Sequence, residues 1–120
     1  MRMKKGDILF GRKKTDAIHP IVFLCEYDTN HFIGVMLTKS NKHKDNILMA
    51  VEHFKKVDSL GNKYEFRYKN THFVEAKLLK KEEWGPYKMV GGLTDFGIKF
   101  IESKIINKDP VLWGKYLNTK

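Results

Sequence analysis

Apolar and polar residues alternate in short blocks along the first 80 residues, a pattern typical of β-strands. Asp7–Phe10 is a brief apolar block, and residues 19–25 form a longer, nearly continuous one. Pro20 must lie at the start of the second strand, because proline cannot donate to a β-ladder. A cluster of turn-forming residues, Tyr27–Asn30, then leads into Phe32–Leu37, and the short connection predicts an antiparallel hairpin.

The pattern is less regular over residues 47–80. Residues 47–54 fit a short helix or a strand. Tyr64, Phe66 and Tyr68 alternate with polar residues and predict a half-buried strand. Residues 71–79 predict one more strand, joined to the preceding one in a hairpin. The pattern therefore predicts about five strands in sequence.

Helical spacing replaces strand spacing after Gly91-Gly92. Thr94 is a candidate N-cap, and Asp95 follows it as an acidic residue in the first turn. An apolar stripe then recurs at helical intervals and predicts a helix that packs on the sheet: Phe96, Phe100, Ile101 and Ile105. The Asp109-Pro110 pair predicts a second, shorter helix over residues 111–117.

Together these elements predict an α+β chain that is mainly β. We expect a small, partly closed β-barrel from strands up to about residue 80, with C-terminal helices at about 94–117. A chain of 120 residues is the size of one domain, and its 42% hydrophobic content is enough for one core. We therefore expect a single domain over residues 1–120.

The chain shows none of the apolar segments that direct a protein into or across a membrane. No apolar run approaches the roughly 20 residues of a membrane span. The first residues lack the apolar stretch of a secretory signal. Cys25 is the only cysteine and lies in an apolar run, so we expect a buried, unreactive thiol. These features predict a cytoplasmic location.

The charge balance narrows the choice of partner. The chain has 23 basic and 14 acidic residues and a net charge of +9, which favours a polyanion such as nucleic acid. Only three of the basic residues are arginines, and lysines hold phosphate as point charges rather than read bases. A lysine-rich surface that only confers solubility is the alternative explanation.

Several well-specified motifs are absent from the sequence. The chain has no phosphate-binding glycine-lysine loop, no dinucleotide fingerprint and no cysteine or histidine pair at metal-ligand spacing. Candidate chemistry lies instead at strand ends. If Leu24 pairs with Phe32 in the predicted hairpin, then His19 lies close to Leu37 and Thr38. An imidazole, a hydroxyl and lysine-rich loops are the parts needed to cleave RNA by attack of a 2′-hydroxyl.

Three short motifs resemble the opening of one protein family. They are Lys5-Gly6-Asp7-Ile8-Leu9, His19-Pro20-Ile21-Val22-Phe23-Leu24 and Val35-Met36-Leu37-Thr38-Lys39-Ser40. Over about the first 40 residues the chain is similar to the PemK/MazF-like toxins, the endoribonucleases of bacterial toxin–antitoxin pairs. The resemblance implies an SH3-like barrel, a homodimer, an acidic antitoxin as protein partner, and cleavage of single-stranded RNA without a metal or other cofactor.

The resemblance also implies roles for individual residues. The family threonine at the end of the third strand falls on Thr38, and the family residue before the proline falls on His19. That residue is arginine in the family, so His19 is expected to exchange a proton instead of holding the phosphate. We assign catalysis to His19 and Thr38. The expected RNA-binding residues are Arg12, Lys13, Lys14, Lys39, Ser40 and Lys42.

Two other functions fit the same sequence. One is a non-catalytic small-barrel module that binds RNA or an acidic peptide through the same basic loops. The other is a structural adaptor whose charge is incidental.

Overall fold

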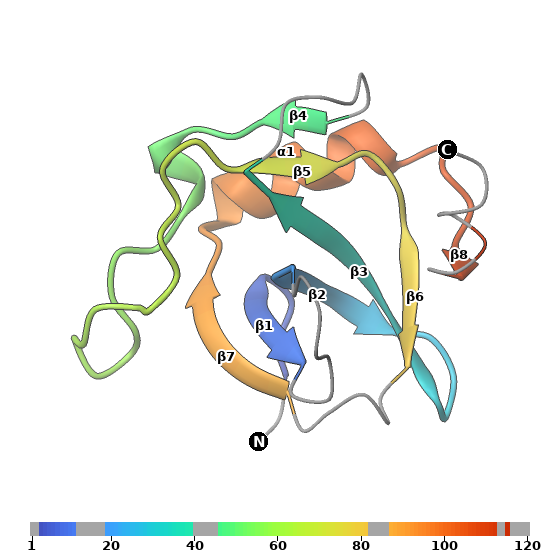
Figure 1. The fold of residues 1–120 in the computed structure, drawn as a ribbon, viewed down its shortest axis with the longest axis horizontal. Coiled ribbons are helices and arrows are strands. Elements are labelled where there is room, and N and C mark those ends of the chain that lie inside the picture. Colours follow the sequence, from blue (N-terminus) through green and yellow to red (C-terminus); the bar gives the residue numbers. More distant parts are fainter. Residues whose placement is uncertain (1–2, 12–18, 40–45, 82–86, 113–114, 116–120) are drawn as a thin grey trace.

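The protein is described by a computed structural model that covers residues 3–11, 19–39, 46–81, 87–112 and 115. Within these residues the fold is mainly β, with one α-helix and one 3-10 helix (Figure 1). The strands are β1 Asp7–Gly11, β2 Ile21–Glu26, β3 His31–Thr38, β4 Asn46–Leu48, β5 His72–Val74, β6 Leu78–Lys81, β7 Tyr87–Gly92 and β8 Val111–Leu112. The helices are η1 Val51–His53 and α1 Asp95–Ile105.

The predicted hairpin of β2 and β3 is confirmed and is antiparallel. Its turn is fixed by Asp28, which accepts hydrogen bonds from the backbone of Asn30 at 2.8 Å and from His31 Nδ1 at 2.9 Å. Both bonds favour the ionised carboxylate and lower the pKa of Asp28. Phe32 lies opposite Glu26 rather than the predicted Leu24, because a bulge shifts the register between Phe23 and Cys25.

The bulge also explains why the prediction for Cys25 is wrong. The first four residues of β2 are buried, whereas Cys25 and Glu26 at its end are exposed. Gly34 lies opposite the bulged segment, and its backbone runs very close to β2. A Cβ atom at position 34 would come within 2.9 Å of Val22 O, so the close approach requires glycine. The apolar run therefore ends one residue before the thiol.

The remaining strands extend this hairpin into one sheet. The order is β4-β5-β3-β2-β1-β7, and β6 pairs with β3 and with β8, the latter in parallel. The single strand predicted over residues 71–79 is wrong, since two strands occupy this range. Ala76 N donates to Val74 O at 2.8 Å, and this tight turn separates β5 from β6. The long β3 accommodates both of them, β5 near Thr38 and β6 near His31.

The strand predicted around residues 64–68 is also wrong, although its alternation is correct. Tyr64, Phe66 and Tyr68 are half-buried and their neighbours are exposed, but no ladder includes them. Phe66 N instead donates to Val90 O at 2.8 Å, so the segment crosses β7. Sequence reasoning missed β7 because glycines interrupt its apolar residues at Gly91-Gly92. These glycines leave room for the segment, since a Cβ on Gly91 would come within 3.0 Å of Phe66 Cβ.

The predicted helix begins where expected. Thr94 caps it by accepting a hydrogen bond from Gly97 N at 3.2 Å. Ile101 and Ile105 are buried as predicted, but Phe96 is 61% exposed. Gly97 is buried in its place, because a Cβ there would collide with the carbonyl oxygen of His53 and prevent α1 from packing on η1.

The second helix, predicted over residues 111–117, begins instead as a strand. Val111–Leu112 forms β8, and Val111 N donates to Lys77 O at 3.0 Å. Pairing beside β6 satisfies backbone groups of Val111–Leu112 that the first turn of a helix would leave without partners. Lys115 is helical, and the other residues of that range lie outside the described part of the chain.

The sheet curves around an apolar interior, and α1 packs against one face of it (Figure 1). The largest buried cluster joins Val22, Val35 and Leu37 of the hairpin to Ile101 and Ile105 of α1. Among the described residues no ladder joins β4 to β7. The connection between η1 and β5 spans this gap, where Lys55 N donates to Gly92 O at 2.9 Å. Over the same residues, no helix is long and apolar enough to cross a membrane.

Candidate functional site

A pocket of about 280 Å³ lies where β2 begins and β3 ends. Its lining includes three of the residues singled out from the sequence, two of them as catalytic. The lining residues are His19, Pro20, Leu37, Thr38, Lys39, Phe66 and Thr71. The structure therefore brings the two candidate catalytic residues, His19 and Thr38, to one concave site.

The hairpin register explains why His19 and Thr38 meet. Leu37 N donates to Pro20 O at 2.9 Å, which continues the pairing beyond Ile21 and leaves His19 beside Thr38. This proximity is the one that the sequence predicts, although the bulge changes the register at the other end of the hairpin. Pro20 takes part without an N–H because only its carbonyl faces β3.

A second histidine lies on the other side of Thr38. The ladder between β3 and β5 places His72 directly opposite Thr38, so the two side chains share a face of the sheet. His72 Nδ1 is buried and has no hydrogen-bond partner among the described residues. No sequence pattern singles out His72, because it is 34 positions from Thr38 and only the pairing of β5 with β3 brings them together.

Lys39 lies in this site, but its ammonium group is held by the chain itself. Its Nζ donates to the carbonyl oxygen of Arg67, to Lys69 O at 2.6 Å and to Thr71 Oγ1 at 2.9 Å. It also lies 5.4 Å from the centre of the Phe66 ring. An ammonium group has three donors, so Lys39 has none left for a phosphate. Partial burial also lowers the pKa of Lys39.

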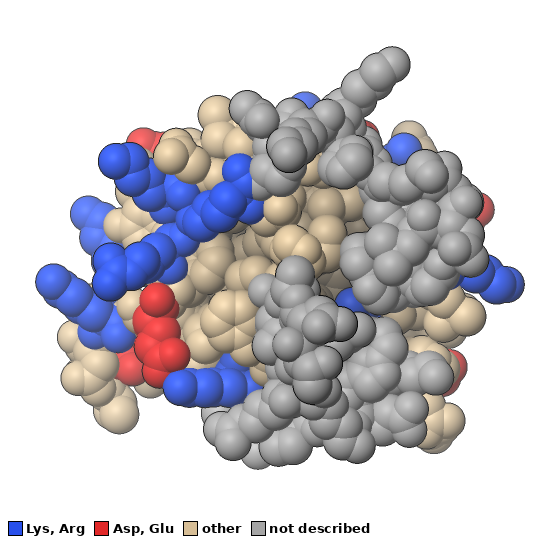
Figure 2. Space-filling view, in the orientation of Figure 1, with Lys and Arg blue, Asp and Glu red and all other residues tan. Residues whose placement is uncertain are grey.

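Five of the expected RNA-binding residues belong to segments outside the described part of the chain. These residues are Arg12, Lys13, Lys14, Ser40 and Lys42. A second group of basic side chains lies on the segment of residues 55–69. Sequence reasoning did not single out this segment. Figure 2 shows blue side chains gathered on the side where this segment lies in Figure 1. Its exposed basic residues are Lys55, Lys56, Lys63, Arg67 and Lys69.

The segment of residues 55–69 is a folded arm rather than an irregular loop. Val57 pairs with Lys63, and Asp58 accepts hydrogen bonds from the backbone of Leu60 and Asn62, both at 2.9 Å. Leu60 at its tip is 84% exposed. Lys39, which lines the His19 pocket, binds the backbone of Arg67 and Lys69, so this end of the arm lies beside the pocket.

The arrangement has three chemical capacities. His19 carries an imidazole that can accept or donate a proton, Thr38 carries a hydroxyl, and the lysines of the arm can hold a polyanion. No protein-family model, curated protein or solved structure matches this chain. Its function is therefore inferred from its own residues.

Proposed function

We propose that this chain is a metal-independent endoribonuclease that cleaves single-stranded RNA and is the toxin of a toxin–antitoxin pair. The observation that carries the proposal is the shared pocket of His19 and Thr38 beside the basic arm. An imidazole beside a hydroxyl, next to a surface that holds phosphates, is what cleavage by the RNA's own 2′-hydroxyl requires.

In the proposed reaction the 2′-oxygen attacks the adjacent phosphorus and the bond from phosphorus to the 5′-oxygen breaks. His19 takes the proton of the 2′-hydroxyl and returns it to the leaving 5′-oxygen. Thr38 donates a hydrogen bond to a non-bridging phosphate oxygen, and Arg67 and Lys69 hold the flanking backbone. The products are one fragment that ends in a 2′,3′-cyclic phosphate and one that begins with a 5′-hydroxyl.

The same proposal includes the finer features of the fold and assembly. An SH3-like, partly closed barrel is supported by the curvature of the sheet and by the contact of Lys55 with Gly92 across its gap. A homodimer is supported by exposed apolar residues on the face formed by β4, η1 and α1, namely Leu48, Val51 and Phe96. An acidic antitoxin segment would be attracted to the arm and would compete with RNA. A cytoplasmic location fits this role.

A module that binds RNA or an acidic peptide without cutting is the second candidate, and two observations favour it. All three donors of Lys39 are used within the chain. Among the residues that line the pocket, His19 is the only imidazole and there is no carboxylate, so the lining offers a single side chain for proton transfer. Such a module needs the basic arm and the pocket but no proton transfer.

The purified chain incubated with mixed-sequence single-stranded RNA in the presence of a chelator distinguishes the two functions. The wild type should produce fragments that end in 2′,3′-cyclic phosphate. His19→Ala should lower the cleavage rate by about 10²-fold or more, because general acid–base catalysis contributes that much. His31→Ala, a histidine at the turn end of the hairpin, is the matched control and should cleave at the wild-type rate.

RNA binding is measured on the same proteins by gel retention at increasing salt. Retention that survives in His19→Ala and Thr38→Ala, with cleavage lost, supports the nuclease. Intact RNA with every protein, together with salt-sensitive retention, overturns the nuclease and supports the binding module.

A further inference from the structure

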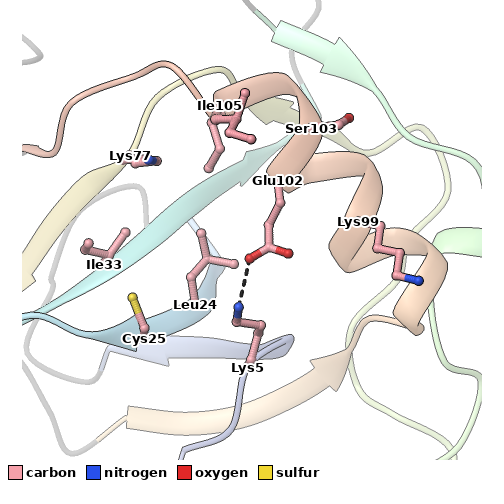
Figure 3. A pocket seen from close by; sticks show the side chains of 10 residues that line it. Lys5, Leu24, Cys25, Ile33, Lys77, Lys99, Glu102, Ser103 and Ile105 are labelled. Carbon is pink, nitrogen blue, oxygen red and sulfur yellow. Dashed lines mark hydrogen bonds and ion pairs between the residues drawn. The ribbon is translucent and has the colours of Figure 1, made fainter.

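A larger pocket lies at the opposite end of the β2–β3 hairpin from His19 and Thr38. Its volume is about 500 Å³, and it opens between α1, the end of β2 and the start of β3 (Figure 3). Leu24 and Ile33 belong to the hairpin end that is distant from the His19 pocket. Pockets of this volume commonly hold small molecules.

The floor of this pocket is apolar. Leu24 and Ile105 are buried beneath it, and Ile33 packs on the same cluster. Ile106 at the mouth is 71% exposed, although it is a large apolar side chain. Water in contact with this surface gains little hydrogen bonding, so an alkyl chain that replaced it would bind favourably.

The rim of the pocket carries more positive than negative charge. Lys5 Nζ donates to Glu102 Oε2 at 2.8 Å, and this hydrogen bond raises the pKa of Lys5. Figure 3 shows the Glu102 carboxylate reaching from α1 toward Lys5. The pair neutralises itself, which leaves Lys77 and Lys99 as the unbalanced charges among the lining residues. Their charge is complementary to an anion.

We propose that this pocket binds a small amphipathic carboxylate, such as a medium-chain fatty acid. Its alkyl chain would lie on Leu24, Ile33 and Ile105, and its carboxylate would meet Lys77, with Lys99 contributing charge from α1. The volume of about 500 Å³ suits one small molecule better than a protein segment. The site uses none of the residues of the proposed nuclease, so it can be tested separately.

Cys25 provides a native reporter for occupancy of the pocket. It lines the pocket, is exposed, and is the only cysteine of the chain. Alkylation of the full-length protein by iodoacetamide, followed by intact mass, therefore reports this site alone. The probe is decanoate, used below its micelle concentration, with circular dichroism to show that the fold is retained. We expect saturating decanoate to slow alkylation about tenfold, because bound chain covers the thiol.

Two related compounds test the two halves of the proposed ligand. Butyrate has the carboxylate with a short chain, and decanol has the chain without the charge. Both should protect Cys25 much less than decanoate does. Equal protection by decanol would overturn the anionic part of the proposal, and no protection by decanoate would overturn the site. An acidic peptide that protects where decanoate fails would indicate a protein partner instead.

Variants locate the carboxylate. Lys77→Gln should weaken protection by decanoate about threefold, since a surface charge pair contributes modestly, and Lys99→Gln should weaken it less. Lys104→Gln is the matched control, because this lysine is also on α1 but lies over Phe100 and does not line the pocket. Unchanged protection in both Lys77→Gln and Lys99→Gln would overturn the assigned head-group position. RNA cleavage by these variants should equal that of the wild type.

Discussion

The two ends of the β2–β3 hairpin use lysine in opposite ways. At the His19 end, Lys39 gives all three of its donors to Arg67, Lys69 and Thr71 of the neighbouring segment. At the turn end, Lys77 lines an apolar pocket and has no such partners among the described residues. Lys39 therefore stabilises the packing of residues 67–71 against the end of β3, whereas Lys77 is available to a ligand.

The difference comes from the backbone around each lysine. Residues 66–71 cross the sheet without joining a ladder, so the carbonyl groups of Arg67 and Lys69 need a donor from elsewhere. Lys39 supplies it. Lys77 lies between β5 and β6, where ladders satisfy most of the backbone. Counting charges in the sequence cannot distinguish these two lysines. Whether a lysine is available to a ligand depends on whether backbone carbonyl groups near it lack another hydrogen-bond donor.

Replacing each lysine by methionine tests this contrast most strongly. Lys39→Met keeps the length of the side chain but removes its donors, which leaves the Arg67 and Lys69 carbonyls without their partner. We expect the free energy of unfolding to fall by about 2 kcal/mol. Lys77→Met should change it by less than about 0.5 kcal/mol, as is usual for a half-buried surface side chain whose removal leaves no partner unsatisfied. Urea denaturation monitored by circular dichroism measures both.

The RNA-binding readout sharpens the same contrast. Lys39→Met should also weaken retention of RNA, because the arm loses its attachment to β3, whereas Lys77→Met should not. Equal stability of the two variants would show that the contacts of Lys39 contribute nothing to the fold and that its charge is available after all.

The response to acid should also differ between the ends, because α1 borders only the turn-end pocket. The helix rests on His53, whose ring stacks on Phe100 at 4.3 Å and whose Nδ1 accepts a hydrogen bond from Ala50 N at 2.9 Å. Burial lowers the pKa of His53, and the nearby Glu52 partly opposes this. The folded state therefore favours the neutral ring, and protonation would remove the acceptor at Nδ1.

The sign of the pH effect follows from the lowered pKa. Below about pH 6.5 the unfolded chain binds a proton at His53 more readily than the folded chain does, so stability falls as the pH falls. The slope from one proton is at most about 1.4 kcal/mol per pH unit. His53→Gln can still accept from Ala50 N but does not titrate. Urea denaturation at pH 7.5 and 5.5 should show a smaller loss for this variant, and an equal loss would contradict the prediction.

Local patterns predicted those parts of the fold that depend on local interactions. The hairpin of β2 and β3 and the Thr94 cap were correct because turn residues, apolar runs and capping groups act within a few positions. The strand predicted at residues 64–68 was wrong and β7 was missed, because each segment depends on the other: Gly91 is small so that Phe66 can pack on it. Such packing between segments leaves no periodic signal in either one.

The candidate site was predictable to a similar extent. His19 and Thr38 were expected to meet because they lie at the open end of one hairpin, and the structure places both in one pocket. His72 was missed because its contact with Thr38 depends on β5, whose pairing partner a sequence pattern cannot specify. The internal role of Lys39 was missed for the same reason, since its acceptors lie about 30 positions away.

The smallest expected effect concerns the Lys5–Glu102 pair at the rim of the turn-end pocket. Both side chains are nearly half exposed, at 49% and 42%, so the pair adds less than about 1 kcal/mol to stability. Glu102→Gln should therefore lower the free energy of unfolding only slightly.

Glu102→Gln should also strengthen protection of Cys25 by decanoate about threefold, because it removes a negative charge beside the carboxylate and frees Lys5. Glu65→Gln is the matched control, since its pair with Lys88 at 2.8 Å is similarly exposed but lies away from this pocket. If both variants bound decanoate equally well, the rim charge would not govern binding at this end of the hairpin, and the contrast with Lys39 would rest on stability alone.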